Sequence, residues 1–233
     1  MKKLQLIAAV FMCVNSFSQD CAGYWYLTNN AEVQMTIFDQ KGKQSGIQTW
    51  TVTEVKKDGK SFTSVLKSSM KDEKGKQIAE STGAYKCTDG VLQADIKMSI
   101  PQEQMQAYKP TEAKLDAVYI DYPYNMSTGQ SLADATFNMD MTMGNGGMPA
   151  KLLFNETNRK VEAKETITTP AGTWEAYKIT YDGLFKVQMS GIGIPVNMVV
   201  NEWFVPGFGV VKTESYNKKG KLMGSTLLTS IKK

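Results

Sequence analysis

The sequence predicts an all-β fold: a single, strongly curved antiparallel β-roll or incomplete barrel with one short helix. Segments rich in branched and aromatic residues, which suit pleated strands, recur between turns rich in glycine, aspartate, asparagine and lysine. The clearest unit is residues 165–181, where Pro170 and Gly172 supply a turn between two strand-like arms. This regular alternation of strand and turn is typical of a meander in a sandwich, roll or barrel.

The pattern breaks once, near the middle of the chain. Ser99 is a suitable N-cap, Pro101 suits the first turn, and the following residues favour a helix that ends before Pro110, so we expect a short helix over residues 99–108. Strands are predicted before it at residues 23–27, 33–39, 46–55, 62–70, 78–87 and 91–98. Strands are predicted after it at residues 115–122, 135–143, 152–155, 159–168, 184–190, 196–204, 210–216 and 222–231, besides the hairpin 165–181.

The N-terminus has the pattern of a secretory signal. Lys2 and Lys3 precede an apolar run that is too short to span a bilayer, and small residues at positions 16 and 18 mark a cleavage site. We therefore expect a signal peptide at residues 1–18 and a single domain at residues 19–233. The mature chain is expected to be soluble in the periplasm or outside the cell, with no transmembrane segment. Lipid attachment at Cys13 or Cys21 is a less favoured alternative, because bulky or polar residues precede both.

Cleavage after residue 18 leaves two cysteines, Cys21 and Cys87. In an oxidising compartment an even pair favours one disulfide, which would stabilise the fold by about 4 kcal/mol on the loop-entropy model. The alternative is two free thiols. No second cysteine lies close enough in sequence to either one to suggest a redox motif.

Charge and composition exclude several functional classes. Without Lys2 and Lys3 the chain has 25 basic and 23 acidic residues, a balance that does not indicate binding to nucleic acid. The sequence contains no histidine, which argues against serine–histidine or cysteine–histidine catalysis and histidine-ligated zinc. Arg159 is the only arginine. We expect no metal, no cofactor and no catalytic residue.

Two segments carry a resemblance to a known family. Residues 169–174 contain the Pro170–Gly172 turn, and residues 203–212 contain a second turn with Pro206, Gly207 and Gly209. Together with the signal, these segments resemble the TapB-like exported bacterial proteins, which are related to an uncharacterised family of β-roll proteins with a domain of unknown function. The resemblance extends over the mature chain. It implies a β-roll and export, and it assigns no catalytic residue.

The methionines are the first feature with possible chemistry. Met139, Met141 and Met143 alternate with polar residues, so all three are expected on one face of the sheet, and Met189 and Met198 add to this set. Thioether side chains fill cores, line adaptable apolar pockets or bind Cu(I). Core filling is the simplest interpretation, an apolar binding surface is the second, and copper is the least favoured because histidine is absent.

Two further features remain open. The loop 191–195 exposes Ile192 and Ile194 between glycines, and it is interpreted as a packed tip, a lid over a cavity, or a tip that contacts a partner. Glu165 and Glu175 would share one face of a regular hairpin, as a carboxylate pair in acid–base catalysis does. The simpler interpretations are inward charge that prevents aggregation, or a bulge that shifts one arm.

The leading functional hypothesis is a non-enzymatic exported envelope protein that binds an apolar ligand or a lipidated partner in a β-roll cavity. The candidate ligand-binding residues are Met139, Met141, Met143, Met189, Met198, Ile192 and Ile194. The alternatives are a structural or adhesive module acting through exposed hairpins, and a hydrolase. Lipid or another envelope protein is the expected partner.

Overall fold

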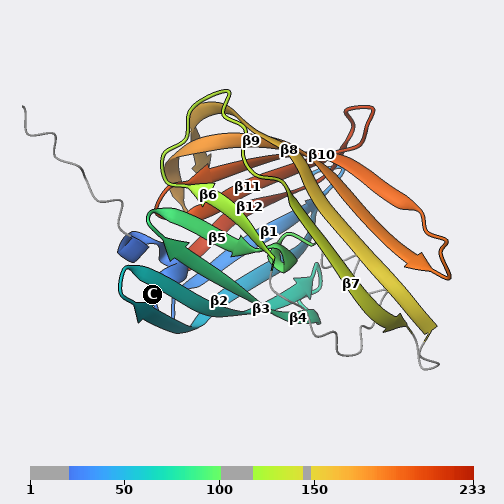
Figure 1. Ribbon diagram of the computed structural model, residues 1–233, viewed down its shortest axis with the longest axis horizontal. Helices are drawn as coiled ribbons and strands as arrows, with labels where there is room; N and C mark the ends of the chain where they lie inside the picture. The colour runs from blue at the N-terminus through green and yellow to red at the C-terminus, as the bar shows by residue number, and fades with distance from the viewer. Residues whose placement is uncertain (1–20, 101–117, 144–147) are drawn as a thin grey trace, which may run out of the picture.

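The structure is a computed structural model that describes residues 21–100, 118–143 and 148–233. The predicted signal peptide lies outside these residues, as does the predicted helix from residue 101 onward. The described chain forms one antiparallel sheet of twelve strands that curls into a nearly closed barrel, which confirms the all-β curved fold (Figure 1).

The first half of the chain begins with two short 3₁₀ turns and continues as a meander. Its elements are η1 (Cys21–Gly23), η2 (Trp25–Leu27), β1 (Glu32–Asp39), β2 (Gln44–Asp58), β3 (Ser61–Asp72), β4 (Gln77–Thr88), β5 (Val91–Asp95), η3 (Ile96–Met98) and β6 (Tyr119–Pro123). The strand predicted at residues 23–27 is wrong. This segment bends to cover one end of the barrel, where Tyr24 is fully buried and the Tyr26 ring stacks on Tyr85 at 4.5 Å.

The second half contains the longest strands. Its elements are β7 (Ala135–Met143), β8 (Met148–Thr169), β9 (Gly172–Met189), β10 (Pro195–Val205), β11 (Gly209–Tyr216) and β12 (Leu222–Lys232). The predicted strands 152–155 and 159–168 are both parts of β8, which continues through two shifts in register. Side chains alternate along β8, so that Leu152 and Phe154 enter the core while Lys151 faces outward.

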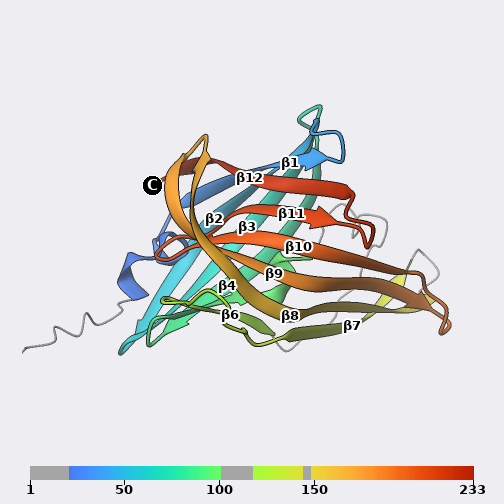
Figure 2. The ribbon, with the colours of Figure 1, turned by 90° about the horizontal axis from the view of Figure 1, so that it is seen from above.

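Nearly every pair of neighbouring strands is also adjacent in sequence. The exception is the pair β1–β12, which joins the two halves of the chain, and this pair leaves β6 and β7 as the two edges of the sheet. The two views of the ribbon show the sheet curving around the core (Figures 1 and 2). Residues 124–134 connect the two edges, and Ser131 forms an isolated bridge with Lys160 of β8.

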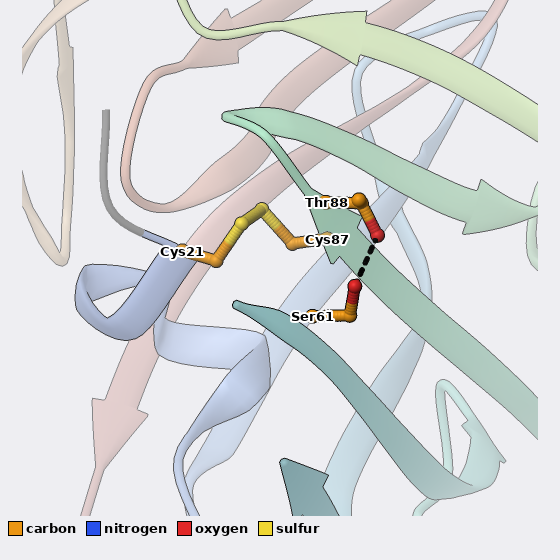
Figure 3. The surroundings of a disulfide bond; sticks show 4 residues. All are labelled: Cys21, Ser61, Cys87 and Thr88. Carbon is orange, nitrogen blue, oxygen red and sulfur yellow. Dashed lines mark hydrogen bonds between the residues drawn. A yellow bond between two sulfur atoms is a disulfide. The ribbon is translucent and has the colours of Figure 1, made fainter. Parts of the chain in front are cut away.

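The disulfide fastens the N-terminal turns to the sheet. Cys21 of η1 is bonded to Cys87 near the end of β4, with the two Cα atoms 5.6 Å apart (Figure 3). Beside it, Thr88 Oγ1 donates a hydrogen bond of 3.0 Å to Ser61 Oγ of the neighbouring strand β3. The disulfide joins two cysteines that are 66 residues apart in the sequence, and both cysteines are buried.

The turns that carry the family resemblance connect neighbouring strands, and packing explains the glycine in one of them. Pro170 lies in the turn between β8 and β9, and Pro206 and Gly207 lie in the turn between β10 and β11. Gly209 has a φ of +136°, and a Cβ atom there would lie 2.8 Å from the ring of Tyr26. A side chain at this position would be strained and would displace the aromatic cover at the end of the barrel.

Candidate functional site

The exposed apolar side chains of the described residues gather at two neighbouring hairpin ends. Met148 is 60% exposed, Met189 is 41%, Ile192 is 80% and Ile194 is 86%. We call these four residues the apolar tips. Only two other large apolar side chains in the described chain are comparably exposed, and they lie on separate strands, Val65 on β3 and Met223 on β12.

Strand register brings the two hairpin ends together. Met148 begins β8, Met189 ends β9, and Ala150 of β8 pairs directly with Met189. Both views show these ends at the same end of the molecule, at the right of each picture, away from η1 and η2 (Figures 1 and 2). Residues distant in sequence therefore form one projecting apolar surface.

The β9–β10 turn is closed by its own backbone. Met189 N donates to Ile192 O at 2.8 Å, and Ile192 N donates to Met189 O at 2.9 Å. Gly193 lies against β9 so closely that a Cβ atom would be 2.3 Å from Val187 O. Ile192 and Ile194 are exposed at this tight turn, while the backbone groups of Met189 and Ile192 that flank its centre are hydrogen-bonded to each other.

The charges near the tips are lysines. The sequence has no aspartate or glutamate between residues 141 and 155 or between residues 183 and 201. Lys151 pairs across the sheet with Gln188 and, on its other side, with Asp140. Lys186 has only the uncharged partners Leu153 and Pro195 in register. Positive charge thus lies a few residues behind the apolar tips, with Asp140 as the carboxylate opposite Lys151.

The methionines predicted to share one binding surface are divided between two places. Met139, Met141 and Met198 are buried on the inner face, although β8 and β9 separate β7 from β10. Met189 belongs to the apolar tips, and the side chain of Met143 lies outside the described part of the chain. The structure does not bring the whole predicted set together.

A buried charged group is the feature that sequence reasoning missed. Glu156 and Arg159 of β8 and Glu202 of β10 all have less than 4% exposure and meet Tyr122 of β6 inside the barrel. Glu156 continues the inward positions of β8, and a register shift between residues 157 and 160, with Asn158 at a φ of +57°, turns Arg159 inward as well. We call these four residues the buried charged cluster.

Arg159 connects both edges of the sheet. Its Nη1 atom donates hydrogen bonds to the Asp121 carbonyl of β6 at 3.3 Å and to the Ala133 carbonyl just before β7 at 2.9 Å. Its Nε atom is 3.6 Å from Glu156 Oε2, and its Nη2 atom is 3.8 Å from Glu202 Oε1. The only arginine of the chain therefore holds the two sheet edges from the interior.

The electrostatics of the cluster favour one protonated carboxyl group. Burial, with a smaller contribution from Glu202, raises the pKa of Glu156 from 4.5 to about 8. Burial also raises the pKa of Glu202, although Arg159 and a hydrogen bond from Tyr122 Oη to Glu202 Oε2 oppose this effect. Arg159 is the cation that faces both carboxyl groups, so protonation of Glu156 reduces the excess of negative charge in the cluster.

Glu165 and Glu175 do not form a carboxylate pair, which was the less favoured interpretation of this hairpin. Thr169 pairs with Gly172 across a two-residue turn, so Glu165 pairs with Ala176 and Glu175 with Thr166, which places the two carboxylates on opposite faces. Glu165 Oε1 accepts a hydrogen bond of 2.5 Å from Trp203 Nε1, and Glu175 accepts one from Thr166. Each carboxylate has a separate structural partner.

The described residues hold neither a cluster suited to a metal ion nor a helix suited to a membrane. No group of three or more histidine, cysteine, aspartate or glutamate side chains is placed to hold a metal ion there. Within the same part of the chain, no helix has the length and apolar character needed to cross a membrane.

Comparison with known proteins supports the fold. A family model described as DUF3108-like matches residues 28–228. The crystal structure of a presumed exported protein with a YmcC-like fold from Bacteroides fragilis is similar with a TM-score of 0.72 and 20% identity, over 88% of this chain and 97% of that one. A presumed lipoprotein from Parabacteroides distasonis is similar with a TM-score of 0.73 and 19% identity, over 88% and 96%. No curated protein matches the chain.

Proposed function

This chain belongs to the DUF3108-like family, and we propose that it is a non-enzymatic exported protein that binds an apolar target of the cell envelope through its apolar tips. The finer TapB-like assignment stays a prediction. Export is supported by the signal-like pattern at residues 1–18 and by the descriptions of the two similar structures. The periplasm and the outer surface are both compatible with these observations.

The observation that carries the proposal is the concentration of exposed apolar side chains at one end of the molecule. An isolated exposed isoleucine is ordinary, but neighbouring apolar side chains on projecting hairpins indicate a contact surface. Ile192 and Ile194 are more than three-quarters exposed although many apolar residues of the flanking strands β9 and β10 are buried. A target that covers these side chains would gain most of their hydrophobic transfer free energy.

The test compares the exported chain with a variant carrying Ile192→Ser and Ile194→Ser. We expect the unaltered chain to sediment with the envelope fraction and the double variant to be mainly soluble. Met223→Ser is the matched control, because Met223 is also an exposed apolar residue but lies on β12. All three chains should unfold at similar denaturant concentrations. Equal sedimentation of the double variant and the unaltered chain would contradict the proposal.

A second candidate function is the binding of an apolar ligand inside the barrel, and the packing of methionines against glycines favours it. Met98 and Met198 cover Gly83 and Gly183 so closely that a Cβ atom on either glycine would meet the methionine side chain at less than 3 Å. Such flexible side chains are able to move aside for a ligand. Lipid extraction and mass spectrometry of the purified protein test this candidate, and consistently ligand-free protein would exclude it.

A further inference from the structure

We propose that the target of the apolar tips is the surface of a lipid bilayer, into whose interfacial region Met148, Met189, Ile192 and Ile194 insert. This inference rests on the proposed function, and it names the partner by its chemistry. Three properties of the tips support it: the backbone hydrogen bonds that close the β9–β10 turn, the order of apolar and basic residues along the strands, and their projecting shape.

Part of the backbone of the β9–β10 turn is already hydrogen-bonded within the protein and does not depend on water there. Inserting an irregular loop into lipid is costly because its N–H and C=O groups lose their water partners. In the β9–β10 turn, Met189 and Ile192 satisfy each other with two hydrogen bonds of 2.8 and 2.9 Å. The side chains of Ile192 and Ile194 can therefore enter the interface without leaving these groups unpaired.

The order of residues from the tips inward, apolar side chains first and lysines next, matches the order of apolar and charged layers at a membrane surface. The apolar residues lie at the ends of the hairpins; Lys151 lies three residues after Met148 on β8, and Lys186 lies three residues before Met189 on β9. Lysines at this depth extend their ammonium groups to lipid phosphates and are attracted to anionic headgroups. The absence of carboxylates between residues 183 and 201 means that no acidic group enters the interface with the β9–β10 hairpin.

The shape of the tips fits a bilayer better than a folded protein. A stable protein–protein interface buries about 800 Å² on each partner, usually over a broad complementary surface. The tips offer four side chains on two projecting hairpin ends, without a surrounding apolar face of comparable exposure among the described residues. A bilayer is fluid and accommodates projecting side chains without a matching surface.

The test uses the purified exported chain and protein-free vesicles of phosphatidylcholine, with or without about one third phosphatidylglycerol. We expect binding to both, and binding that is several-fold tighter to the anionic vesicles. The double variant Ile192→Ser and Ile194→Ser should bind at least about tenfold more weakly to both. Lys151→Gln with Lys186→Gln should remove most of the preference for anionic lipid. Met223→Ser is again the control.

A spectroscopic measurement reports insertion directly. Because the two cysteines of the described chain are joined in the disulfide, Ile192→Cys supplies a thiol that can carry a polarity-sensitive fluorophore. We expect its emission to shift to the blue on addition of vesicles, and we expect no shift for the same label on Met223→Cys. The absence of vesicle binding by the unaltered chain, or equal binding by the serine double variant, would overturn the inference.

The outcomes separate this inference from the proposed function. The tips could prove necessary for sedimentation with the envelope while the chain does not bind protein-free vesicles. The target is then an envelope protein, and only the lipid inference fails. If sedimentation and vesicle binding are both unaffected by the tip substitutions, both proposals fail. Binding to vesicles that depends on Ile192 and Ile194 supports both.

Discussion

Replacing Glu156 by glutamine should change how the stability of this protein depends on pH. Glutamine has nearly the shape of a protonated glutamic acid, so it preserves packing against Arg159 and Glu202. Burial raises the pKa of Glu156 in the folded protein to about 8, compared with 4.5 for an ordinary glutamate. The folded state therefore holds a proton that the unfolded chain has released between these two pH values.

The sign and size of the change in the free energy of unfolding with pH follow from proton linkage. A raised pKa in the folded state means that the contribution of Glu156 is complete below about pH 4.5 and is lost as the pH rises through about 8. With about 1.4 kcal/mol for each pKa unit, the wild-type free energy of unfolding should fall by about 3 kcal/mol between pH 5 and pH 8 because of this group. The glutamine variant should not show that part of the fall. The two proteins should be similar at pH 5, and the variant should be more stable at pH 8.

The assay is urea unfolding with the disulfide intact, followed by circular dichroism from about pH 5 to about pH 9. Glu162→Gln is the matched control, because Glu162 lies on the same strand but is exposed and pairs only with Lys160 at the surface. Equal pH slopes for wild type and Glu156→Gln would refute the reasoning, as would a variant that is less stable than wild type at pH 8. Unchanged m-values would show that the comparison concerns stability and not a change in the unfolded state.

The remaining predictions concern stability. Arg159→Met should lower the free energy of unfolding by about 3–5 kcal/mol in urea titrations, because it leaves buried carboxyl groups without their cation, and a loss below about 1 kcal/mol would contradict this role. Reducing the disulfide between Cys21 and Cys87 should cost about 4 kcal/mol, measured by unfolding with and without reductant, and an unchanged midpoint would be inconsistent with this contribution. Gly209→Ala should cost about 1–3 kcal/mol in thermal unfolding, because of its positive φ and the nearby aromatic ring, whereas Gly23→Ala, which meets open space, should cost much less.

Much of the fold could be predicted because the relevant signals are local. Branched and aromatic residues identified the strand segments 152–155 and 159–168 of β8, and glycine-containing turns marked most hairpins. The pairing of Cys21 with Cys87 followed from their being the two cysteines left after the predicted cleavage. These inferences needed only residue type and spacing.

The candidate site was only partly predictable. The loop 191–195 was recognised as a possible contact tip, but its proximity to Met148 depends on the register of β8 with β9. The buried charged cluster left two signals in the sequence: Arg159 is the only arginine, and Glu156 and Glu202 occupy inward positions of alternating strands. Neither signal revealed that the three side chains meet.

The sequence by itself determined most of the strands and their turns, because these properties depend on residues close together along the chain. Tertiary structure decided that β1 pairs with β12 and that Arg159 turns inward at a bulge. A shift of one residue in register reverses every side chain that follows, and it depends on contacts between distant segments. For the same physical reason, the hairpins could be predicted from the sequence, whereas the assembly of the buried charged cluster and of the apolar tips could not.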